Sequence, residues 1–220
     1  EIPLRLVGSE MCIRDRLWVT GKKVSNSWAH ADEESSVYEL KAYVENIFLR
    51  LGLNMRNLVV GNLTDDIYAA ALSVQTKGGK RLATFGIVTK KILKAFDIDN
   101  EVYYADLNWK ELMKAIRSVK ISYAEISKFP AVKRDLALLV DKKVQFAEIE
   151  KIAYETEKKL LKDVSLFDVY EGKNLEAGKK SYAVSFLLQD ENQTLNDKMI
   201  DKIMSKLVKN LEDKLDAKLR

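Results

Sequence analysis

The stretch KFPAVKRDLALLVD, residues 128–141, decides how the second half of this chain folds. Pro130 has no amide hydrogen and disfavours the helical region for the residue before it, so the stretch begins extended or turned. Residues 136–140 form an apolar run that is too short for a helix and ends at Asp141-Lys142-Lys143. This pattern predicts a buried central strand over residues 134–140.

The segments that follow supply partners for this strand. Apolar residues recur at helical spacing over residues 146–159, two strand-like runs cover residues 164–170 and 180–189, and a second amphipathic helix covers residues 197–211. A last short strand is expected at residues 217–219. The order βαββαβ predicts a ferredoxin-like sandwich, in which two helices cover one face of a four-stranded antiparallel sheet and leave the other face free to bind.

The first half of the chain predicts a second α+β unit. Ser35 and Ser36 precede an apolar stripe that runs to Leu51, and Gly52 is a typical stop, so a capped helix is expected. Strands are expected at residues 17–20, 59–60, 67–74, 81–88 and 101–107, and short helices at residues 89–96 and 109–119. The sequence KGGK at residues 77–80 is interpreted as a hairpin turn, because phosphate cradles of this kind lead into a helix.

Composition restricts the function classes. The chain has 220 residues, 47% of them hydrophobic, which suffices for one large or two small cores. A single cysteine, Cys12, excludes an internal disulfide framework and fits a reducing cytoplasm, while a single histidine excludes the usual two-histidine zinc sites. We expect no metal site, no catalytic residues and no membrane-spanning segment.

Charge gives no signal for general nucleic-acid binding. The net charge is +4, and residues 121–220 carry 19 basic against 18 acidic groups. Contact with RNA would therefore require a local patch, and binding to DNA is not expected.

Residues 1–16 differ in pattern from the rest. Residues 6–15 resemble a translated sequencing adapter, so we interpret residues 1–16 as a probable non-native leader, with an ordinary variable terminus as the alternative. The predicted organisation is then a leader at 1–16, a first domain at 17–120 and a second domain at 121–220.

Several motifs of the second domain carry a family resemblance. The segments at residues 129–141, 166–172 (LFDVYEG), 178–190 (GKKSYAVSFLLQD), 193–201 (QTLNDKMID) and 217–220 (AKLR) resemble the C-terminal anticodon-binding domain of the β subunit of bacterial phenylalanyl-tRNA synthetases. Residues 17–28 (LWVTGKKVSNSW) and 37–53 are similar to the end of the same subunit's core-like domain, a non-catalytic relative of the class II synthetase core. The resemblance implies a partial core-like antiparallel sheet domain followed by a ferredoxin-like anticodon-binding domain.

The resemblance also implies site residues. An aromatic ring at Tyr170 could stack an unpaired base, and Asp168, two residues earlier on the same strand face, could accept a hydrogen bond from a base. Ser181 offers a small hydroxyl, and Lys180 beside it offers a positive charge that attracts phosphate. Ala137 is small enough to let a base approach the strand. By similarity to the family, these five residues are the expected RNA contacts.

The wider role follows from the same resemblance. Family members attach phenylalanine to its tRNA with ATP and, we expect, magnesium, through chemistry performed on the α subunit of a cytoplasmic α2β2 assembly. This chain would contribute anticodon binding and a subunit scaffold and bind no cofactor itself. Without the rest of the core-like domain, we expect the first domain to expose apolar surface and to be less stable than the second. We also expect the chain alone to bind RNA weakly.

The second domain has two other interpretations. An acylphosphatase-like enzyme would need a glycine-rich loop and an arginine after the first strand, whereas residues 140–144 read VDKKV. A protein-interaction or regulatory module without RNA binding remains an alternative, because balanced charge does not reject it. Salt dependence of binding separates the two, since phosphate contacts weaken as salt rises.

Overall fold

The computed structural model describes residues 14–120, 123, 125–172 and 175–220. The chain divides into two compact units, Glu1–Ser122 and Tyr123–Arg220. The leader prediction lies outside the described residues except at its end. Arg14–Thr20 forms strand β1, so the first strand begins three residues before the predicted position and includes residues assigned to the leader.

The first unit contains a five-stranded antiparallel sheet in the order β1-β7-β6-β5-β4. The other strands of this sheet are β4 Val59–Leu63, β5 Tyr68–Gln75, β6 Arg81–Val88 and β7 Val102–Asn108. A two-stranded ribbon joins β2 Lys22–Val24 to β3 Glu33–Glu34. The helical elements are α1 Val37–Arg50, η2 Met55–Asn57, α2 Lys90–Ala95, α3 Trp109–Ala115 and η3 Ile116–Ser118. The predicted strands and the hairpin at residues 77–80 are confirmed.

Local sequence fixes the ends of α1. The Ser36 hydroxyl accepts a hydrogen bond from the amide of Glu39 at 3.4 Å, and Gly52 has a φ of 76°, which favours glycine. Between these ends, Leu40, Val44 and Phe48 are fully buried against the sheet. The predicted capped amphipathic helix is therefore confirmed.

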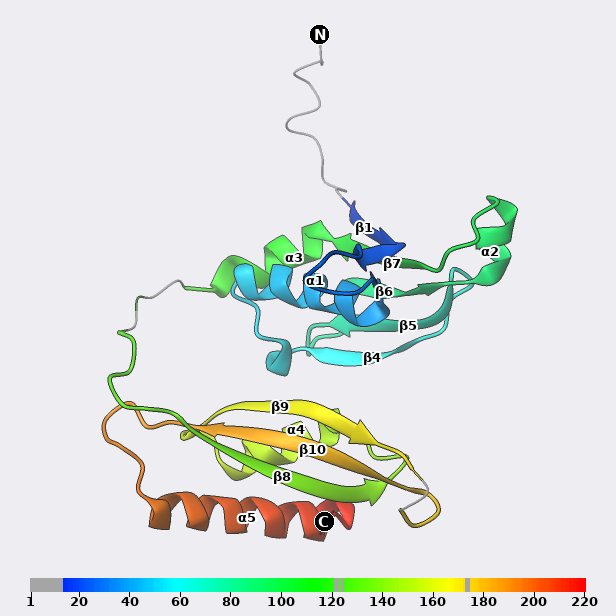
Figure 1. The fold of residues 1–220 in the computed structure, drawn as a ribbon. Coiled ribbons are helices and arrows are strands. Elements are labelled where there is room, and N and C mark those ends of the chain that lie inside the picture. Colours follow the sequence, from blue (N-terminus) through cyan, green and yellow to red (C-terminus); the bar gives the residue numbers. More distant parts are fainter. Residues whose placement is uncertain (1–13, 121–122, 124, 173–174) are drawn as a thin grey trace. The chain divides into compact units, whose positions relative to one another are not determined.

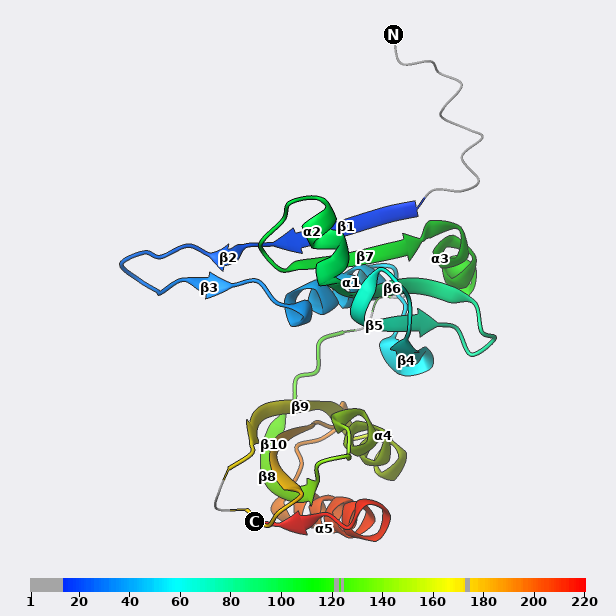
Figure 2. The same cartoon turned by 90° about the vertical axis from the view of Figure 1, so that its right-hand side faces the viewer.

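The second unit has the predicted βαββαβ order. Its elements are β8 Val132–Asp141, α4 Phe146–Thr156, β9 Leu161–Tyr170, β10 Lys179–Leu188, α5 Asp197–Leu215 and β11 Lys218–Leu219. The strands form an antiparallel sheet in the order β11-β8-β10-β9, which confirms the ferredoxin-like fold. Both helices lie on one side of this sheet (Figures 1 and 2).

Element bounds differ from the prediction where side chains reorganise a boundary. Helix α4 ends at Thr156, three residues early, because the Glu157 carboxylate accepts hydrogen bonds from the amides of Lys159 and Leu160 at 3.0 and 3.1 Å. These bonds turn the chain into β9. Helix α5 continues four residues beyond residue 211, to Leu215, and is capped by Asp216, whose φ is 50°.

The cores of the two units are organised differently. Leu138, Val184, Phe186 and Leu207 belong to one continuous cluster that joins the second sheet to both of its helices. The buried residues of the first unit fall into two separate clusters, and Trp18, Leu49 and Val59 are 61%, 70% and 51% exposed there. Exposed apolar surface in the first unit was expected.

These cores predict that the first unit has a lower free energy of unfolding than the second. In hydrogen exchange on the intact chain, amides of β8 and β10 should be protected longer than those of β5 and β6, because the buried side chains of the first unit are divided between two clusters instead of forming one continuous core. Central strands of the two sheets are the matched comparison. Equal protection, or longer protection in β5 and β6, would contradict the expected order of stability.

Candidate nucleic-acid interface

The face of the second sheet that the helices leave uncovered is built by side-chain alternation. Successive side chains of a strand point to opposite faces, so Leu138 and Tyr182, which pair with each other, both enter the core. The residues between them in sequence face the other way. We call this side the open face.

Strand register sets two rows of side chains across the open face. One row joins Ala137, Ala183 and Asp168, and the next joins Leu139, Ser181 and Tyr170. The structure thus brings together four of the five predicted contacts, Ala137, Asp168, Tyr170 and Ser181. The two alanines make the centre of the first row shallow, and a planar group can approach the backbone there.

Tyr170 stands at the end of β9 under a basic side chain. The Arg220 guanidinium carbon lies 5.2 Å from the centroid of the Tyr170 ring, within cation–π range. Arg220 reaches this position because its amide donates to the carbonyl oxygen of Ala137 at 3.0 Å, which continues the pairing of β11 with β8. The sequence reasoning did not identify Arg220 as a site residue, and only the position of β11 beside β8 reveals it.

Gly172 fixes where the Tyr170 ring lies. A Cβ atom placed on Gly172 would overlap the Tyr170 hydroxyl oxygen and its ring carbon Cζ. Any side chain at this position would therefore push the ring aside. The glycine in the segment LFDVYEG has a steric role toward the aromatic ring.

Exposure differs among the predicted contacts. Asp168 is exposed, whereas Ala137 and Tyr170 are half-buried. Ser181 is only 5% exposed, so its hydroxyl reaches a ligand only when neighbouring side chains on the open face move. Asp168 and Tyr170 are the groups that a ligand meets first.

Lys180 is separated from the other four residues. It pairs with Val140, whose side chain is in the core, so Lys180 points to the helix-covered face. It is 8% exposed, and its Nζ lies 4.6 Å from the Tyr182 ring centroid. The structure therefore separates Lys180 from Ser181, because neighbouring residues on a strand face opposite ways.

A β-bulge adds an aromatic ring that alternation did not predict. Ala183 pairs with Asp168 and Val184 with Leu166, which leaves Phe167 as an extra residue in β9. Phe167 is 58% exposed, and Lys133 Nζ lies 5.6 Å from its ring centroid. No signal in the sequence marks the position of this bulge.

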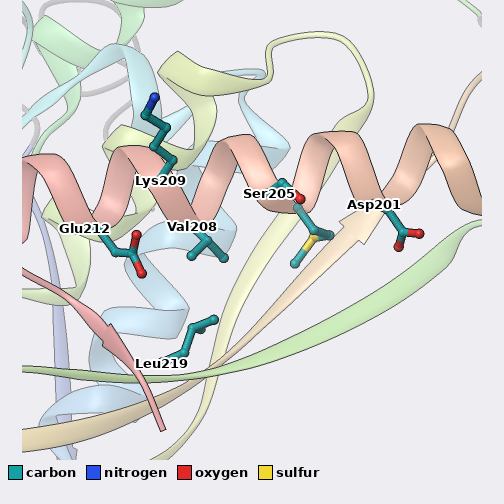
Figure 3. Close-up of a pocket in the computed structure, with 7 residues that line it drawn as sticks. Asp201, Ser205, Val208, Lys209, Glu212 and Leu219 are labelled. Carbon is teal, nitrogen blue, oxygen red and sulfur yellow. The ribbon is translucent and has the colours of Figure 1, made fainter.

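Two hollows lie elsewhere. A groove of about 420 Å³ runs along α5, where Val208 and Leu219 face each other and Asp201 and Glu212 lie on either side (Figure 3). A hollow of about 230 Å³ in the first unit is lined by residues that include Tyr68 and Tyr104, and burial raises the pKa of Tyr68 to about 12. Neither hollow holds the predicted contacts.

The part of the chain that the structure describes has neither a cluster of metal-binding side chains nor a helix suited to a membrane. No group of three or more histidine, cysteine, aspartate or glutamate side chains is placed to hold a metal ion there. In the same residues, no helix is long and apolar enough to cross a bilayer.

Two segments of the chain match known protein families. Residues 127–220 match the family described as "Ferredoxin-fold anticodon binding domain", and residues 16–109 match "Phenylalanyl tRNA synthetase beta chain CLM domain". The chain belongs to the phenylalanine–tRNA ligase beta subunit family. The recognition made from the sequence motifs is confirmed.

Individual relatives agree with this assignment. The chain is 89% identical over 204 residues to the "Phenylalanine--tRNA ligase beta subunit" of Bacteroides fragilis, covering 93% of this chain and 25% of the relative. The protein of that name from Bacteroides thetaiotaomicron matches with the same identity and coverage. The one from Porphyromonas gingivalis is 52% identical over 208 residues, covering 94% of this chain and 25% of the relative. The chain spans about a quarter of the length of these curated relatives.

The contact between Gly172 and Tyr170 is testable in the free protein. Gly172→Ala should shift the ring resonances of Tyr170 in NMR spectra of ¹³C-tyrosine-labelled protein, because the added methyl displaces the ring from Arg220. Stability should change by less than about 1 kcal/mol, since the site is at the surface. Gly61→Ala is the matched control, because its new methyl meets no atom within 4 Å. Unchanged Tyr170 resonances in Gly172→Ala would contradict the packing described.

Proposed function

We propose that the open face of the second unit binds the anticodon loop of phenylalanine tRNA. The observation that carries the proposal is the ring of Tyr170 beside the shallow row of Ala137, Ala183 and Asp168. Unpaired bases in RNA loops are recognised by stacking on aromatic rings and by hydrogen bonds to their edges, and this face offers both.

Each group has a chemical role in this proposal. The Tyr170 ring stacks one base, an interaction worth roughly 1–3 kcal/mol. The Asp168 carboxylate accepts a hydrogen bond from a base amino or imino group, and the Ser181 hydroxyl contacts the RNA once neighbouring side chains move. The small side chain of Ala137 leaves room for the base. Lys180 is not included, because it lies on the helix-covered face.

Charge on the open face suits a short contact with RNA. Lys133, Lys218 and Arg220 alternate onto this face, while Asp135, Asp163 and Asp168 share it. The basic groups attract phosphates near Tyr170, and the acidic groups oppose a broad electrostatic footprint. We therefore expect the chain alone to bind RNA weakly, with a shallow dependence on salt.

In the whole protein, we propose that this segment supplies tRNA recognition and scaffold to a cytoplasmic phenylalanine–tRNA ligase. The synthetase α subunit, in an α2β2 assembly, is the proposed partner and the site of chemistry with ATP and magnesium. Exposed apolar side chains of the first unit, such as Trp18 and Val59, support a scaffold role for that unit. No catalytic step is assigned to residues of this chain.

The test is binding of the full chain to the anticodon stem-loop of phenylalanine tRNA at several salt concentrations. Tyr170→Ala should weaken binding roughly 5- to 150-fold, because it removes one stacked base. An anticodon-changed stem-loop should bind more weakly than the native one. Tyr123→Ala is the matched control, since Tyr123 is 89% exposed in the same unit and precedes the sheet.

Three results would contradict the proposed binding of RNA to the open face. Equal binding of both stem-loops, no loss in Tyr170→Ala, or no dependence on salt would contradict RNA recognition by this face. A protein-interaction module would then be the better account of the second unit.

A further inference from the structure

The β-bulge in β9 places an exposed aromatic ring beside the proposed anticodon site. Counting back from Tyr170 and Asp168 with strict alternation would send Phe167 toward the helices. The extra residue in the β9 register breaks that alternation, and Phe167 is 58% exposed. Bulges commonly redirect a side chain next to a functional site.

Contact with Lys133 shows which face the ring occupies. Lys133 pairs with Leu187, and the next residue, Arg134, pairs with the core residue Phe186, so Lys133 points to the open face. Its Nζ lies 5.6 Å from the Phe167 ring centroid. Phe167 and Lys133 therefore repeat, on the same face, the arrangement of Tyr170 with Arg220.

The two aromatic positions are spaced along one strand. Phe167 precedes Tyr170 by three residues, which corresponds to about 10 Å of extended strand and less across a bulge. Asp168 lies between the rings in sequence. A segment of unstacked RNA lying along β9 would thus meet a ring, a hydrogen-bond acceptor and a second ring.

We propose that Phe167 and Lys133 form a second base-stacking position, which takes a different nucleotide of the loop from the one on Tyr170. The phenylalanine ring supplies a stacking surface without base specificity, and Lys133 attracts the adjoining phosphate. The inference rests on the proposed function, because it assigns a second nucleotide to the same RNA. The Phe167 ring is not part of the core cluster, and stacking on an RNA base gives a reason for its exposure.

The experiment pairs protein variants with stem-loops that lack one base at a time in the anticodon loop. Wild-type chain, Phe167→Ala, Phe167→Trp and Tyr170→Ala are compared by affinity for every stem-loop. Phe167→Ala should bind the intact loop at least about fivefold more weakly, while Phe167→Trp keeps binding because it keeps a ring. Val169→Ala is the matched control, because Val169 pairs with the core residue Tyr182 and is 47% exposed.

Coupling between base and ring identifies the position. At one loop nucleotide, removal of the base should weaken wild-type binding but leave Phe167→Ala unaffected, and this nucleotide should differ from the one coupled to Tyr170. Lys133→Ala should reduce the slope of log affinity against log salt by about 1. Lys202→Ala, an exposed lysine on α5, should leave the slope unchanged.

Failure of this inference is distinguishable from failure of the proposed function. If a base couples to Tyr170 and none couples to Phe167, the second position is overturned and anticodon recognition stands. If Phe167 couples to the same nucleotide as Tyr170, the second position is also overturned. If no base couples to either ring, both proposals fail, and Phe167 is then a surface for contact with protein.

Discussion

Antiparallel pairing of β8 with β10 is the constraint on which the second unit depends. Ten residue pairs run from Lys179 with Asp141 to Leu188 with Val132, without a shift in register. A shift by one residue would send the core side chains of both strands to the solvent face, so the apolar pattern specifies this register strongly. The same register determines the composition of the open face.

One face of the second sheet forms the core and the other face is open, so a small domain can be stable and still bind a ligand. Leu138, Val184 and Phe186 face the helices and are completely or almost completely buried. Ala137 and Ala183, which immediately precede Leu138 and Val184 in sequence, face the other way and leave the open face shallow. Stability and recognition therefore rest on different side chains of the same strands, and the open face can carry exposed rings without loss of core packing.

Much of this arrangement could be predicted from the sequence. The apolar run at residues 136–140, the helical spacing after it and the serine cap of α1 each act through local physics, and each predicted element formed. Asp168 and Tyr170 were placed on one face by a two-residue spacing, and their pairing with Ala183 and Ser181 confirms it. Family motifs gave the identity of the domain.

The position of Lys180 could have been predicted from strand alternation, whereas those of Phe167 and Arg220 depend on strand pairing between distant segments. Alternation itself places Lys180 opposite to Ser181, yet the two were grouped by adjacency. The bulge at Phe167 depends on pairing with β10, and the contact of Arg220 with Tyr170 depends on β11 lying beside β8. Pairing partners of these kinds cannot be read from a local pattern in one sequence.

Amide chemical shifts in a titration of ¹⁵N-labelled chain with the anticodon stem-loop would show which face of the second unit binds RNA. If the open face binds, the largest shifts fall on the strand segments around Ala137, Asp168–Tyr170 and Ser181–Ala183, and the exposed side of α5 is unaffected. Largest shifts on α4, α5 or the first unit, with the sheet unchanged, would contradict binding of RNA by the open face.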